Sequence, residues 1–298
     1  MPMKVLEINN LSKSYGKTKA LNDLSLTLEK GNIYGLLGPN GSGKTTTLGI
    51  IMDVLKANEG NYTWFEGQFD PHPRLNIGAI LETPNFYPYL NATDNLKIVQ
   101  HIKKSPEDDL DSLLKWVNLY DRRKSNFKSF SLGMKQRLAI AASLIGEPEV
   151  LIFDEPTNGL DPQGIAEIRE IILKIADEGK TILMASHILD EVEKICSHVA
   201  ILKSGKLLAS GPVGTILDDN PILELGVSAD KEIDLFNWVN ARDDIQFIQK
   251  DGNILLLSIS SELQPEDINS ATFQQGIVLQ HLKMRKRTLE EEFLSITQ

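Results

Sequence analysis

Gly38-Pro-Asn-Gly-Ser-Gly-Lys-Thr45 decides the fold, because it fits the phosphate-binding pattern G-x-x-x-x-G-K-[ST] at every fixed position. Glycines let consecutive backbone N–H groups turn inward around phosphates, and Lys44 adds a positive charge. Thr45 offers a hydroxyl to Mg²⁺ and, with Thr46, opens a helix whose positive dipole end faces the anion. A bare glycine-rich turn is the alternative. The pattern predicts a nucleotide site that includes Gly38, Pro39, Asn40, Gly41, Ser42, Gly43, Lys44, Thr45 and Thr46.

Two apolar runs end in polar residues suited to the same site. Residues 150–153 read as a strand buried on both faces, and Asp154 and Glu155 follow it. Adjacent carboxylates there are costly unless a cation meets them. We expect Asp154 to hold Mg²⁺ through water and Glu155 to polarise the water that attacks the γ-phosphate. Residues 181–186 form a similar run, and it ends in His187 at the same predicted sheet edge.

Ser131 precedes a helical pattern with Leu138, Ala141 and Ile145 on one face. Two interpretations are open. Ser131 caps its own helix and nothing more, or the hydroxyl and the N–H groups of this helix end form a second anion site.

With these motifs in order, the chain resembles the nucleotide-binding subunit of an ATP-binding cassette (ABC) transporter over residues from about 4 to 215. Residues 130–134 align with the family signature and keep its serine and second glycine, Ser131 and Gly133. In this family two cassettes sandwich ATP head to tail, so the resemblance implies that this signature faces the partner's γ-phosphate, in a homodimer or a heterodimer. It also implies adenine stacking on Tyr15, a Q-loop at Glu82, a D-loop with Asp161 and a switch role for His187.

The predicted fold class is α/β: a P-loop NTPase cassette with a parallel-sheet core, an antiparallel β subdomain and an inserted helical subdomain over about 90–145. Strand-like and helical segments alternate again from about residue 150, as parallel sheets require. The turn-rich residues 210–214 suggest a boundary. We therefore expect a nucleotide-binding domain over 1–215 and a small α+β domain over 216–298, which either regulates or dimerises the protein or only extends the fold.

Composition limits the function. The net charge of −10 opposes nucleic acid as a main ligand, and the basic residues 283–287 are expected to form a solvated edge. The single cysteine, Cys196, excludes an internal disulfide and a cysteine-based metal cage, and its spacing predicts a buried residue. The N-terminus lacks the apolar core of a signal peptide, and no apolar run is long enough to span a membrane. These features predict a protein at the cytoplasmic face of the membrane, held there by a separate permease.

The function expected from the resemblance is ATP hydrolysis, with Mg²⁺, that powers export of a drug, antibiotic or peptide-like compound. The alternative is a soluble ABC ATPase that acts on a ribosome or a repair complex. Glu82 departs from the family, which usually has glutamine there; a similar glutamate occurs in cassettes resembling lantibiotic-immunity exporters. It is expected either to contribute to the metal site and to catalysis, linking the metal to the permease, or to stay in solvent.

Overall fold

A computed structural model describes residues 3–216, 221–260 and 263–297. The chain divides into two compact units, Met1–Val213 and Gly214–Gln298. Each unit has its own hydrophobic core. No helix among the described residues combines the length and apolar character that a bilayer crossing requires.

A six-stranded sheet forms the centre of the first unit, in the order β5-β6-β7-β3-β8-β9. Neighbours from β5 to β8 run parallel, and β9 pairs antiparallel with β8. Every residue of β3, β6 and β7 is buried, which explains their uninterrupted apolar runs. The strands are β3 (Ile33–Leu37), β5 (Ile77–Ile80), β6 (Val150–Asp154), β7 (Thr181–Ser186), β8 (His198–Lys203) and β9 (Lys206–Pro212).

Helix α1 (Lys44–Ile51) follows β3, α5 (Pro162–Asp177) connects β6 to β7, and α6 (Leu189–Ile195) connects β7 to β8. Asp161 caps α5 by accepting a hydrogen bond from the Gly164 N–H at 2.8 Å, and Pro162 occupies the first helical position. Cys196 lies at the end of α6 and is buried.

An antiparallel sheet, in the order β2-β1-β4, packs its leucine-rich face into the same core. Its strands are β1 (Lys4–Tyr15), β2 (Thr18–Glu29) and β4 (Glu59–Trp64). The chain leaves β4 at Trp64, because Phe65 and Glu66 adopt positive φ angles.

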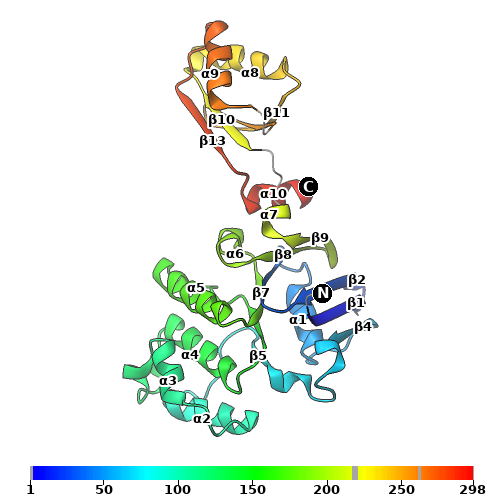
Figure 1. The fold of residues 1–298 in the computed structure, drawn as a ribbon, viewed down its shortest axis with the longest axis vertical. Coiled ribbons are helices and arrows are strands. Elements are labelled where there is room, and N and C mark those ends of the chain that lie inside the picture. The colour runs from blue at the N-terminus through cyan, green and yellow to red at the C-terminus, as the bar shows by residue number, and fades with distance from the viewer. Residues whose placement is uncertain (1–2, 217–220, 261–262, 298) are drawn as a thin grey trace. The chain divides into compact units, whose positions relative to one another are not determined.

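Three helices lie together on one side of the six-stranded sheet, as Figure 1 shows. They are α2 (Ala92–Lys103), α3 (Leu110–Trp116) and α4 (Leu132–Leu144). The side chains of Asn91, Asp109 and Ser131 cap them. The predicted helical segment thus contains three helices, and two short 3₁₀ turns lie between α3 and α4.

The second unit has an antiparallel sheet in the order β11-β12-β10-β13, with a core that includes Leu223, Leu225 and Leu257. Its strands are β10 (Ile222–Gly226), β11 (Ile245–Asp251), β12 (Ile254–Ile259) and β13 (His281–Arg285). Its helices are α8 (Glu232–Asn240), α9 (Pro265–Gln274) and α10 (Leu289–Thr297), and α7 (Val213–Ile216) spans the division between the units.

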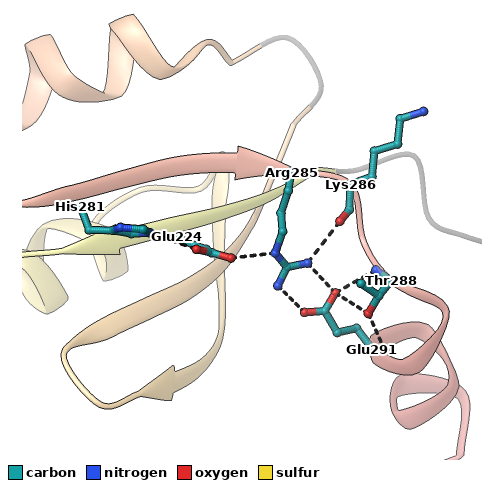
Figure 2. A network of polar contacts seen from close by, with 6 residues as sticks. All are labelled: Glu224, His281, Arg285, Lys286, Thr288 and Glu291. Carbon is teal, nitrogen blue, oxygen red and sulfur yellow. Dashed lines mark hydrogen bonds and ion pairs between the residues drawn. The ribbon is translucent and has the colours of Figure 1, made fainter. Parts of the chain in front are cut away.

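The basic residues 283–287 correct one prediction. Lys283 and Lys286 are exposed, but the two arginines between and beside them are not a solvated edge. Arg285 bridges Glu224 on β10, at 2.7 Å, and Glu291 on α10, at 2.7 and 2.9 Å (Figure 2). Arg287 pairs with Glu292 at 3.1 Å, and both side chains are only 12% exposed. Carboxylates brought close by the fold therefore fix these arginines in place.

Candidate functional site

The carboxyl ends of four adjacent strands bring the predicted catalytic residues to one edge of the sheet. Asp154 ends β6, Glu155 follows it, and His187 follows β7. The Gly38–Thr45 loop leaves β3, and Glu82 lies two residues beyond β5. Since β5, β6, β7 and β3 are parallel neighbours, their ends form one continuous edge, where open α/β sheets bind ligands.

The loop between β3 and α1 has a backbone that only glycine accepts easily. Gly43 has φ of 112°, and a Cβ atom there would lie 2.7 Å from the Ala20 carbonyl oxygen. A Cβ on Gly38 would lie 2.4 Å from the Leu202 carbonyl oxygen. These contacts explain why the pattern requires glycine at both positions.

Lys44 is held inside this loop. Its side chain is 6% exposed, and its ammonium donates to the Gly38 carbonyl at 2.8 Å and lies 3.5 Å from Glu155 Oε1. No side chain in the described part of the chain caps α1, so the N–H groups of its first turn are available to an anion. Among the described residues the buried Ser42 hydroxyl has no hydrogen-bond partner. A phosphate group fits this combination of a buried cation, free N–H groups and an unsatisfied hydroxyl.

Asp154, Glu155 and His187 form the acidic side of the site. Glu155 Oε2 lies 2.7 Å from His187 Nδ1, and Glu155 adopts a left-handed backbone with φ of 51°. Burial raises the pKa of Asp154, the Thr45 hydroxyl and Lys44 oppose that rise, and the carboxylates of Glu155 and Glu82 add to it. In the described part of the chain, Asp154 Oδ1 is buried without a hydrogen-bond partner. A divalent cation would satisfy this oxygen, so the donor set fits the predicted Mg²⁺, with Thr45, Asp154 and Glu82 as the residues that would hold it.

A cavity of about 260 Å³ connects these groups. Thr45, Asp154, Glu155 and the exposed Glu82 all line it. Two amide side chains that the sequence analysis did not single out, Gln136 and Asn158, line it too. The sequence signal that could have identified Gln136 is its position four residues after Leu132, because this spacing places both side chains on one face of α4.

The signature residues occupy a different cavity, of about 420 Å³. Ser131, Gly133 and Asp161 line it together with Arg137 and Glu167. The Ser131 hydroxyl accepts a hydrogen bond from the Met134 N–H at 3.3 Å, so it does cap α4. Leu132, which lies between Ser131 and Gly133, lines both cavities, whereas Ser131, Gly133 and Asp161 line only the second of them.

Tyr15 lies at the end of β1, where its ring is 48% exposed. The Lys13 ammonium lies 5.2 Å from the ring centroid, and Tyr15 lines neither of the two cavities above. An adenine base could reach this open face, but its stacking there stays a prediction.

Comparisons with known proteins agree with this geometry. A family model described as "ABC transporter" matches residues 21–158. The bacitracin transport ATP-binding protein BcrA of Bacillus licheniformis is 36% identical over 98% of this chain and 97% of its own length. The chain belongs to the ABC transporter ATP-binding family. This cassette is also 44% identical to the lantibiotic transport ATP-binding protein SrtF of Streptococcus pyogenes, over 68% of this chain and 89% of that protein.

The fold comparison leads to the same family. A dimeric ATP-binding cassette, solved in a post-hydrolysis state with ADP and Pi bound, superposes with a TM-score of 0.62 and 25% identity, covering 70% of this chain and 98% of that one. The predicted α/β cassette fold is confirmed. This chain is thus the ATP-binding subunit of a transporter, of a family that hydrolyses ATP to drive transport.

Proposed function

We propose that two copies of this cassette, or this cassette and a different one, hydrolyse ATP with Mg²⁺ and drive a separate membrane permease that exports an antibiotic or a peptide-like compound. The observation that carries the catalytic part is the edge of four parallel strand ends, which gathers Lys44, Asp154, Glu155 and His187. The export part rests on the relatives named for bacitracin and lantibiotic transport.

In this proposal each residue has a distinct role. Lys44 exchanges the Gly38 carbonyl and the Glu155 carboxylate for phosphate oxygens, so binding replaces contacts that the chain makes within itself. Glu155 takes a proton from the attacking water, and His187 orients the carboxylate through their 2.7 Å contact. When bound, Mg²⁺ supplies positive charge against the developing charge on the phosphates.

The two cavities support the proposed dimer. Ser131 and Gly133 present a helix end to a cavity whose described lining includes no residue of the phosphate loop. A head-to-tail partner would place its own triphosphate there, where N–H donors and the helix dipole favour an anion. The dimeric relative with bound ADP and Pi supports this arrangement.

The permease contact is proposed for residues 83–90, the loop that precedes α2. Tyr87 and Tyr89 are 49% and 69% exposed, and the centroids of their rings lie 5.9 Å apart. Exposed aromatic side chains are typical of protein interaction sites. A permease bound there would hold the cassette at the cytoplasmic face of the membrane.

Co-purification and transport measurements test this proposal. Tyr87→Ala is expected to lower the yield of the permease complex and transport, while the isolated cassette keeps its ATPase activity. Phe273→Ala removes a more exposed aromatic, 69% against 49% for Tyr87, from the second unit and serves as the control. Full transport and a full yield of complex with Tyr87→Ala would refute the assignment of this loop.

A further inference from the structure

Helix α4 faces both cavities at once. Ser131, Gly133 and Arg137 line the signature cavity, whereas Gln136 lines the cavity of Asp154 and Glu155. Residues four apart, such as Gly133 and Arg137, share a face of a helix, and Gln136 lies about 140° around the axis from Ser131. The helix that carries the signature therefore also contributes a side chain to the chain's own hydrolytic site.

Gln136 is an unusual residue for its position. Its side chain is 5% exposed, and it makes no hydrogen bond within residues 3–216, 221–260 and 263–297. The amide is not among the fully enclosed polar atoms that lack a partner in the described chain, so it opens onto the cavity that the side chain lines. An amide in this situation is poised to bond to a group that moves into the cavity.

The groups that share the cavity identify that partner. Three carboxylates line it, those of Glu82, Asp154 and Glu155. Glu155 is already bonded to His187 and lies close to Lys44, and the Thr45 hydroxyl opposes the rise in the pKa of Asp154 that burial causes. Glu82 is exposed, sits on a left-handed backbone with φ of 60°, and its side chain has no hydrogen bond or ion pair in the described chain. Asp154 keeps one free acceptor, Oδ1, which the predicted Mg²⁺ would take, whereas both carboxylate oxygens of Glu82 are free in the described chain.

We propose that Gln136 is a positioning residue for ATP hydrolysis, whose amide N–H donates to the Glu82 carboxylate and holds it on the Asp154 side of the cavity. This inference rests on the function proposed above. A carboxylate that accepts an amide hydrogen bond is less strongly repelled by its acidic neighbours than a free one. Because Gln136 belongs to α4, a displacement of the signature end of this helix also displaces Glu82.

Two substitutions of Gln136 test the hydrogen bond in the full chain. Gln136→Met keeps the shape of the side chain and removes the donor, so kcat for ATP is expected to fall about tenfold with little change in KM, as the loss of one charge-assisted hydrogen bond predicts. Gln136→Glu places a fourth carboxylate in the cavity. It is expected to lower kcat further and to weaken ATP binding in EDTA, where no metal screens the charge.

The decisive measurement is a reciprocal exchange. Combining Gln136→Glu with Glu82→Gln restores one amide and one carboxylate, so both kcat and the metal-free ATP affinity should recover most of the loss. A role of Gln136 in packing alone predicts no such recovery. If Gln136→Met does not fold, the double variant Gln136→Glu with Glu82→Gln still tests the hydrogen bond.

Ser143→Ala is the matched control, because it removes another buried polar group from α4, one that bonds only to the Ile140 carbonyl. Its hydrolysis rate should equal that of the wild type. Unchanged kcat in Gln136→Met, or no recovery in the exchange, would overturn the inference while leaving the proposed function intact. A wild-type chain that does not hydrolyse ATP would refute the proposed function and this inference with it.

Discussion

Glu291 is predicted to fasten α10 to the sheet of the second unit, and Glu291→Gln tests this. The carboxylate accepts two hydrogen bonds from Arg285, at 2.7 and 2.9 Å, and one from the Thr288 N–H at 2.9 Å (Figure 2). The Glu291 N–H donates in return to the Thr288 hydroxyl at 3.3 Å. Thr288 and Glu291 thus form a capping box at the start of α10, and the same carboxylate is a bidentate partner of an arginine.

The free energy by which the Glu291 carboxylate stabilises the fold follows from its pKa. The Arg285 guanidinium lowers that pKa from 4.5 to about 2. At 1.36 kcal/mol per unit this corresponds to about 3.4 kcal/mol, which solvent screening of a partly exposed pair reduces to about 1–2 kcal/mol. The folded pKa is depressed, so this stabilisation is fully present above about pH 4.5 and is lost as the pH falls toward about 2.

Hydrogen exchange of the peptide that covers α10 measures the effect. At neutral pH, Glu291→Gln is expected to speed exchange by a factor of about 5–30. Glu290→Gln is the control, because Glu290 is the exposed neighbour in the same helical turn. The difference between wild type and Glu291→Gln should narrow as the pH falls below about 4.5. Equal exchange rates at neutral pH would refute the assignment of a stabilising role to this carboxylate.

Three further predictions concern the hydrolytic site. Lys44→Ala should lower ATP affinity about 10–100-fold because a charge-assisted contact to phosphate is lost. Glu155→Gln should still bind ATP, lower kcat by about 10²–10⁴ and accumulate as an ATP-held dimer. Light scattering and steady-state kinetics check both variants, and normal turnover by Glu155→Gln would show that another residue is the base. Ser131→Arg should stop hydrolysis yet leave the nucleotide affinity of the monomer unchanged, and an equal loss of both in titrations would mean that the signature acts within its own subunit. Glu82→Ala should keep ATP binding and lose much of the permease-stimulated ATPase activity, while Glu82→Gln should keep substantial activity with an altered Mg²⁺ dependence. If the permease stimulates the ATPase activity of Glu82→Ala as much as that of the wild type, Glu82 has no such role.

Local patterns made the first unit largely predictable. Strands β3, β6 and β7 are buried on both faces, so each appears in the sequence as an apolar run, followed by the glycine loop after β3 and by polar residues at the ends of β6 and β7. Parallel pairing then places those ends on one edge, whatever the order of the strands. In the second unit, α8 and β12 were also predictable from their apolar spacing.

Features that depend on tertiary contacts were not predictable. The pairing of Arg285 with Glu224 joins residues 61 positions apart, so the charge pattern alone suggested solvated arginines. The left-handed backbone at Glu82 and Glu155 has no sequence signal, because glycine and asparagine are the residues normally expected there. The place of Gln136 in the hydrolytic cavity likewise depends on how α4 packs beside β5, which no local pattern specifies.

Cys196 makes the natural sequence a convenient background for labelling. It is the single thiol of the chain, it is 7% exposed, and burial raises the pKa of its thiol, so almost no reactive thiolate is present at neutral pH. A maleimide or a spin label would therefore react with a cysteine introduced on the surface and leave the native one untouched. In a pair of identical cassettes, each copy would carry one probe, and the separation of the two probes would follow nucleotide binding without any prior removal of native cysteines.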